Sequence, residues 1–170
     1  MKSKDHEKLV TALMSWENGL NKLGKCIVQF QLIEEVLSVC ISSMVGRSRK
    51  IGKIVTTEMS YKARVAVYRA LFIHHFGTDS LPDDILELIS RLNWAEQERN
   101  SLVHSLWDAS EEFPETIMRS KAACRKKGLN VDKEHIRPEE LEDLANLYEG
   151  IATDLTYLTE RYLPKVKIKF

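Results

Sequence analysis

The stretch that decides the fold is PDDILELISRLNWAEQERNSLVHSLW, residues Pro82–Trp107. Pro82 and the two aspartates after it are typical of a helix start, because proline fits the first turn and carboxylates complement the helix dipole. Apolar residues then recur every three or four positions, which predicts one unbroken amphipathic helix over the whole stretch. Its apolar positions are Ile85, Leu88, Leu92, Ala95, Leu102 and Leu106.

Arg99 falls on this apolar stripe, where a buried guanidinium without a partner would be strongly destabilising. It therefore needs a carboxylate or a phosphate, or the stripe must open there onto a wet pocket or a subunit interface. Asn100 and His104 are four residues apart, so their side chains share the adjoining face of the helix. A cation, an amide and an imidazole thus converge beside the core, which favours a chemically active site.

The N-terminal segment predicts a very long first helix. Its apolar residues alternate in steps of four and three from Leu9 to Met44, and Gly46 is a natural stop. Gly19 and Gly24 each weaken a helix by about 1 kcal/mol relative to alanine, so a kink or break near Gly24 is an open alternative.

Glu34 occupies one position of that first stripe, so each of the two helices places one charge on its own core face. We expect Glu34 and Arg99 to be partners. The first helix also overruns the others in length, and its apolar stripe from Leu9 to Leu23 would project beyond a four-helix core. A second copy of the chain would cover it, which predicts a homodimer.

The remaining segments alternate between helices and irregular stretches. Residues 46–59 combine glycines with basic residues and favour a basic loop with a short extended piece. Ser60 is expected to cap a second helix that ends at Gly77. Residues 109–137 lose helical periodicity, and Arg119–Lys127 within them reads either as a short helix or as an extended piece. Pro138 then starts the last helix, which continues up to Pro164.

These segments predict an all-α fold, an antiparallel bundle of four main helices with a long first helix that a kink could interrupt. We expect one domain over residues 1–170, with an N-terminal helical extension (1–24) and an irregular basic insertion (109–137) before the last helix.

Composition excludes some classes of protein. Lys and Arg number 25 and Asp and Glu number 25, and this balance argues against non-specific coating of nucleic acid. The N-terminus lacks the apolar core of a signal peptide, and no 18-residue stretch is free of charged and polar residues, so we expect a cytoplasmic protein with no membrane partner. Three widely spaced cysteines predict reduced thiols, and their spacing suggests neither a metal nor a cofactor.

The motif Arg99-Asn100-Ser101-Leu102-Val103-His104 resembles the signature of the HEPN family, small helical-bundle domains many of which are metal-independent ribonucleases. That signature is an arginine, a polar residue and a histidine four to six residues beyond the arginine. The likeness covers the bundle from about Ile27 to Tyr162 by helix order, but its specific part is the six-residue motif. Some toxin members carry a tyrosine that is modified by a partner enzyme where this chain has Leu106, so that form of regulation is not expected here.

The resemblance implies a dimer whose motif helices face each other across one cleft, and RNA cleavage by attack of the 2′-hydroxyl on the adjacent phosphate. In that chemistry Arg99 would hold the phosphate and His104 would transfer protons. Asn100 would orient either the imidazole or the phosphate. Glu34 would support Arg99, and Trp107 could stack on a base. The resemblance also admits a toxin or defence role with an antitoxin-like protein partner.

Two basic stretches are candidates for tracking the RNA backbone, although a solvated surface is the simpler explanation of each. Other HEPN members lack catalysis, so the alternative is a dimeric interaction module that binds a nucleotide, an RNA or a partner helix. A purely structural interpretation is also open, in which Glu34 and Arg99 form a buried pair that fixes the helix register and His104 is a surface residue. The candidate RNA-binding residues are Arg47, Arg49, Lys50, Lys53, Arg119, Lys121, Arg125, Lys126 and Lys127.

Overall fold

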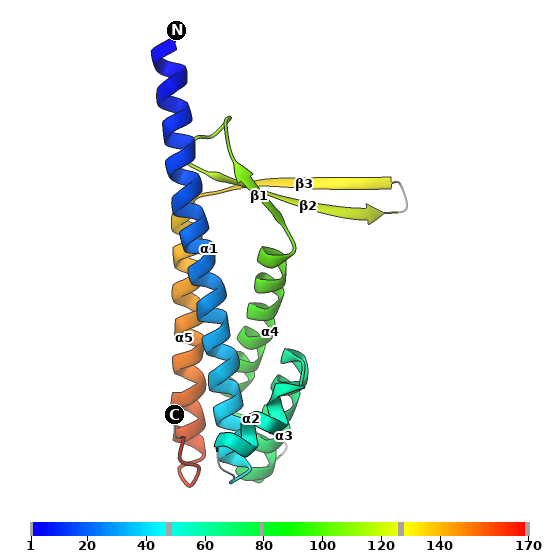
Figure 1. The fold of residues 1–170 in the computed structure, drawn as a ribbon. Helices are drawn as coiled ribbons and strands as arrows, with labels where there is room; N and C mark the ends of the chain where they lie inside the picture. Colours follow the sequence, from blue (N-terminus) through cyan, green and yellow to red (C-terminus); the bar gives the residue numbers. More distant parts are fainter. Residues whose placement is uncertain (1, 47–48, 79, 126–127, 169–170) are drawn as a thin grey trace. The chain divides into compact units, whose positions relative to one another are not determined.

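The structure, a computed structural model, describes residues 2–46, 49–78, 80–125 and 128–168 (Figure 1). They form a largely helical fold with a long first helix, as the sequence predicts, and a small sheet of three strands. The elements in chain order are α1 (Lys2–Met44), α2 (Arg49–Thr57), α3 (Tyr61–Phe76), α4 (Asp83–Val103), β1 (Leu106–Ala109), β2 (Ile117–Arg125), β3 (Gly128–Ile136) and α5 (Pro138–Tyr162).

The chain divides into two compact units. One, called here the sheet unit, comprises Met1–Val28 and Glu98–Asn146. The other, the helical unit, comprises Gln29–Gln97 and Leu147–Phe170. Because α1, α4 and α5 each contribute residues to both, the unit boundaries fall inside helices rather than in linkers.

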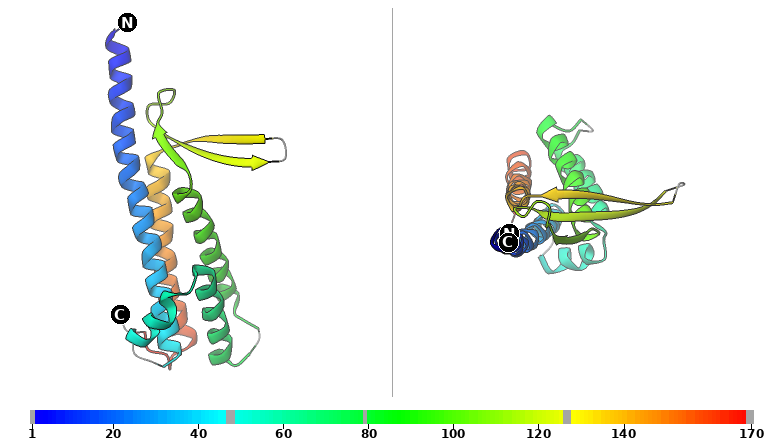
Figure 2. Two further views of the ribbon diagram at one scale, coloured as in Figure 1. Left: turned by 45° about the vertical axis from the view of Figure 1, so that its right-hand side comes forward. Right: turned by 90° about the horizontal axis from the view of Figure 1, so that it is seen from above.

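Aromatic side chains form the centre of the helical unit. The ring of Phe30 on α1 lies 5.0 Å from that of Tyr61 on α3 and 5.8 Å from that of Tyr148 on α5. The two tyrosine hydroxyls donate to carbonyls of α4, Tyr61 to Leu92 at 3.1 Å and Tyr148 to Ala95 at 3.3 Å. These buried rings therefore satisfy their polar atoms on a third helix while packing with each other. In two views, the part of α5 in this unit runs beside the corresponding part of α1 (Figure 2).

Helix α2 replaces the basic loop predicted for residues 46–59, so that prediction was wrong. Gly52 and Thr56 are its buried positions. A Cβ on Gly52 would overlap the side chain of Ser42 on α1, so glycine is what allows the two backbones this close approach. Close packing against α1 thus outweighs the low helix propensity of glycine and of the β-branched residues that suggested a loop.

The predicted ends of α3 are confirmed. The Ser60 hydroxyl accepts a hydrogen bond from the Ala63 amide at 3.2 Å, as an N-cap does. At the other end Gly77 has φ 80°, and its amide donates to the Ile73 carbonyl at 2.9 Å.

The sheet replaces the predicted irregular insertion at 109–137, and it also ends α4 earlier than the sequence indicated. Helix α4 stops at Val103, and Trp107 belongs to strand β1 rather than to the helix. The strand order is β1-β2-β3 and both pairings are antiparallel. Strand β1 pairs only with residues 117–120, so β2 and β3 continue beyond it as a two-stranded ribbon (Figure 1).

In the sheet unit, α1 buries a different face from its leucine stripe. Ala12, Gly19 and Cys26, spaced by seven residues, are buried, while Leu9 and Leu13 are each more than half exposed. The expected projection of the N-terminal apolar stripe is therefore visible on the surface of this unit. Helix α1 also continues through both of its glycines.

Within the described residues, His6–Met44 of α1 is the one helical stretch long and apolar enough to cross a membrane. This follows from length and composition alone, and more than half of its most apolar window is buried within the structure. A core helix passes the same test, so the stretch is weak support for a membrane span.

Candidate functional site

The Arg99–His104 motif occupies the C-terminal end of α4, where the last helical carbonyls need donors from outside the helix. No glycine follows to provide the usual cap. The His104 amide donates to the Asn100 carbonyl at 3.1 Å and the Ser105 hydroxyl donates to the Ser101 carbonyl at 2.6 Å. The Trp107 indole N–H then donates to the Leu102 carbonyl at 3.0 Å. The motif is therefore held by a helix end that its own downstream neighbours cap.

Arg99 and Asn100 form the polar pair of the site. Arg99 Nη1 donates to Asn100 Oδ1 at 3.0 Å, and both residues are half-buried. A guanidinium presents its five N–H donors in a planar fork that matches the geometry of a phosphate. The Asn100 amide holds this guanidinium from the neighbouring position.

His104 lies outside the last turn of α4 and is exposed. Two exposed apolar side chains accompany it, Val103 at 45% exposure and Leu106 at 76%. Leu106 is the more exposed because it stands on β1, next to the helix end. Exposed aliphatic residues on both sides of an exposed histidine are typical of a surface that another molecule covers.

Trp107 and Arg119 are direct partners on the adjacent strands β1 and β2. The sequence assigns one to base stacking and the other to the RNA backbone. The register pairs Trp107 of β1 with Arg119 of β2, and Arg119 with Glu134 of β3. Arg119 forms an ion pair with Glu134. Arg119 is thus held by a carboxylate within the sheet and is less available to a phosphate than the sequence suggested.

Glu34 forms its ion pair with Arg64 of α3, at 3.6 Å between Glu34 Oε1 and Arg64 Nη1. Arg64 Nε also donates to the Thr56 carbonyl at 3.1 Å, so Arg64 ties α1, α2 and α3 together inside the helical unit. Arg99 belongs to the sheet unit, and the predicted Glu34–Arg99 pair stays a prediction.

Arg64 is the residue that the sequence interpretation missed, although the signal was present. It lies three residues after Tyr61 and four before Tyr68, on the inward face of the second helix. The same argument that singled out Arg99 applies to it and would have given Glu34 a second candidate partner.

The structure divides the candidate RNA-binding residues between the two units. Lys50 and Lys53 lie exposed on α2, and Lys53 is 3.4 Å from Glu35. Lys121 is exposed on β2, opposite Asp132 of β3. Of the others, Arg49 and Arg125 are placed by their backbones in α2 and β2, and Arg47, Lys126 and Lys127 lie outside the described residues.

Within the part of the chain that the structure describes, no three His, Cys, Asp or Glu side chains gather as metal ligands would. Cys26 and Cys40 are buried free thiols, as expected. Burial raises the pKa of Cys26 to about 11 and that of Cys40 to about 12, which keeps both protonated and unreactive at neutral pH.

No family model, no curated protein and no solved structure matches this chain.

Proposed function

We propose that this chain is a metal-independent endoribonuclease of the HEPN type, with a composite site in a homodimer. The observation that carries the proposal is the geometry at the end of α4: a hydrogen-bonded Arg99–Asn100 pair followed, one turn later, by an exposed His104. A phosphate-binding fork, an orienting amide and an imidazole that can transfer protons are the parts that cleavage of RNA by its own 2′-hydroxyl needs.

In this mechanism the His104 imidazole removes the proton from the 2′-hydroxyl. The resulting oxygen attacks the adjacent phosphorus, a 2′,3′-cyclic phosphate forms, and the bond to the 5′-oxygen breaks. An imidazolium from the second copy returns a proton to that leaving oxygen. Arg99 stabilises the charge that develops on the phosphate, and Asn100 holds Arg99 in place for it.

The dimer is supported by the apolar residues that surround His104. Val103 and Leu106 would be covered if the ends of two α4 helices faced each other, and the same contact would bring two histidines to one phosphate. A cytoplasmic location belongs to this proposal, because RNA is its substrate, and an antitoxin-like partner would be a regulator of the same cleft.

A non-catalytic dimeric binding module is the second candidate, and one observation favours it. Arg119 is paired with Glu134 and Lys121 lies opposite Asp132, so acidic neighbours offset the basic residues expected to track RNA along the sheet. A module that binds a partner helix or a nucleotide at the same dimer cleft would need no such track.

Incubation of the purified protein with RNA in EDTA separates the two. We expect cleavage to products that end in a 2′,3′-cyclic phosphate, loss of cleavage in His104→Ala, and a severe loss in Arg99→Lys, whose point charge cannot replace a planar fork. His6→Ala, which changes an exposed histidine on α1, is the matched control and should cleave normally. Equal cleavage by wild type and His104→Ala, or none by wild type, would remove the enzyme proposal.

The composite site has its own test in Leu106→Ser. This change places a small polar residue on the edge strand β1 and removes the most exposed aliphatic side chain beside His104. We expect the mass in solution and the cleavage rate to fall together. A wild-type monomer at every concentration would leave the composite cleft without support.

A further inference from the structure

Helix α2 turns its large side chains away from the core. Its buried positions are the small residues Gly52 and Thr56, whereas Ile51, Ile54 and Val55 are 46%, 65% and 56% exposed. These three aliphatic residues follow the i, i+3, i+4 spacing of a helix face that docks in a groove, and we call them the α2 ridge. An outward aliphatic ridge does not suit an RNA backbone, which favours a different kind of partner for this segment.

The charged residues within α2 itself are all basic, and the exposed Glu58 directly follows the helix. The sequence of α2, RKIGKIVTT, carries three basic residues and no acidic one. Lys50 is exposed beside the ridge, and the nearby Lys53 is 3.4 Å from Glu35 of α1. The basic residues of α2 favour a partner surface that is apolar and acidic.

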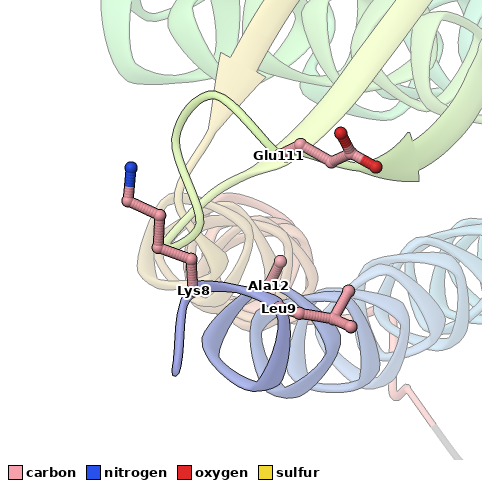
Figure 3. Close-up of a pocket in the computed structure, with 4 residues that line it drawn as sticks. All are labelled: Lys8, Leu9, Ala12 and Glu111. Carbon is pink, nitrogen blue, oxygen red and sulfur yellow. The ribbon is translucent and has the colours of Figure 1, made fainter. Parts of the chain in front are cut away.

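The sheet unit of the same chain carries a surface of that kind. A groove of about 500 Å³ is lined by aliphatic residues of α1 and β2 and by carboxylates that follow from β1 into the next loop. Lys133 and His135 are its basic lining residues. A smaller pocket adjoins it, where Lys8, Leu9 and Ala12 of α1 lie across from Glu111 (Figure 3). The aliphatic and acidic residues of this N-terminal groove are Leu9, Leu13, Met118, Asp108, Glu111 and Glu112.

We propose that the α2 ridge of one copy of this chain docks in the N-terminal groove of a second copy. Ile51, Ile54 and Val55 enter between the exposed leucines of α1 and Met118, and Lys50 meets the carboxylates at the rim. The α2 ridge and the N-terminal groove, both exposed to solvent in one copy, are complementary in apolar character and in charge.

This contact joins two different surfaces, so a pair of copies still has one free ridge and one free groove. Such a head-to-tail contact forms a ring or an open chain and does not stop at two copies unless geometry closes it. It is independent of the proposed ribonuclease dimer, in which identical surfaces around His104 face each other. A lipid surface would cover the ridge but would leave the acidic groove unexplained.

Charge reversal on each surface provides the test. Lys50→Glu reverses one charge beside the ridge and leaves two basic residues in α2, and Glu112→Lys makes the groove less acidic while the ridge stays basic. Measured by sedimentation of the full chain at low salt, wild type should form assemblies larger than a dimer that grow with concentration. Each variant alone should show weaker growth, and an equimolar mixture of the two should restore it, because each reversed charge then meets the reversed charge on the other surface.

The aliphatic part of the contact needs a salt-independent variant. Ile54→Ser removes the most exposed residue of the ridge, and we expect it to abolish growth at low and at high salt. Leu86→Ser is the control, because it changes an exposed leucine on α4 that belongs to neither surface. This variant should assemble as wild type does.

Several outcomes would overturn the proposal. Wild type at one fixed mass over the whole concentration range would do so, and so would a mixture of the charge variants that stays as small as its components. Binding to vesicles of anionic lipid that requires Ile54 and Lys50, without self-assembly, would assign the ridge to a lipid surface instead. His104→Ala and Leu106→Ser leave both surfaces intact, so failure of the ribonuclease proposal and failure of this one are read from different variants.

Discussion

Gly19 of α1 and Ile117 of β2 lie in close contact inside the sheet unit. A Cβ built on Gly19 of α1 would lie 2.7 Å from both Cδ1 and Cγ2 of Ile117 on β2, a separation that real side chains do not tolerate. Ile117 is fully buried at this place. The strand therefore sits against α1 only because the helix offers a position without a side chain.

Gly19→Ala should destabilise the protein by about 1 to 3 kcal/mol, because the added methyl overpacks a buried contact. Gly24→Ala is the matched control, since a Cβ there would meet nothing within 4 Å. Alanine at Gly24 should stabilise by up to about 1 kcal/mol through helix propensity. Urea unfolding of the two variants gives the comparison, and a stabilising Gly19→Ala would mean that Ile117 does not pack there.

This pair also shows why the sequence predicted helices well and the sheet poorly. The leucine repeat of α1 identifies a long helix, but the face buried in the sheet unit consists of Ala12, Gly19 and Cys26, which no hydrophobic pattern marks. Strand β2, IMRSKAACR, has few β-branched residues and little alternation, so its pairing with β3 depends on contacts distant in sequence.

The candidate site shows the same division between helical residues, which the sequence predicts, and strand residues, which it does not. Arg99, Asn100 and His104 follow from one helix, its period and a motif, and the structure places them at the end of that helix. Trp107 was assigned to the helix because its apolar spacing continues past Val103. The strand that it joins depends on β2, ten residues further along the chain, and local periodicity carries no information about that partner.

The close packing of Gly52 on α2 against Ser42 on α1 gives a second prediction. Gly52→Ala should detach α2 from α1, because the new Cβ would overlap both Oγ and Cβ of Ser42. Adding Ser42→Gly should restore the contact, whereas adding Ser42→Ala should not, since alanine keeps the overlapping Cβ. Amide hydrogen exchange in α2 measures this: fast exchange in Gly52→Ala alone, slowed again only in the Ser42→Gly pair. Unchanged exchange in Gly52→Ala would contradict the packing.

Glu142 predicts a pH dependence of stability. Hydrogen bonds and ion pairs from Lys22 and then Lys25 lower its pKa below the ordinary 4.5. A carboxylate whose pKa is lower in the folded than in the unfolded state stabilises the fold above about pH 4.5, and this contribution is lost as the pH falls through its folded pKa.

Glu142→Gln should therefore lower the Tm at pH 7, and the difference from wild type should shrink as the pH is brought well below 4.5. High salt should reduce the difference too, because these groups are accessible to solvent. Glu149→Gln controls for the loss of one charge from the same helix. A Tm difference as large at low pH as at pH 7 would show that the lysines do not act through the carboxylate charge.

Variants of Trp107 distinguish its role in capping the end of α4 from a role in binding an RNA base. Trp107→Phe keeps an aromatic ring on β1 but removes the N–H that donates to the Leu102 carbonyl, so we expect a loss of about 1 kcal/mol in unfolding free energy. If the ring stacks on RNA, cleavage should persist in Trp107→Phe and fall sharply in Trp107→Ala, measured below the unfolding temperature of each variant. Trp94→Phe, a more exposed tryptophan earlier on α4, is the control. Equal cleavage by Trp107→Phe and Trp107→Ala would show that Trp107 caps the end of α4 and does not stack on an RNA base.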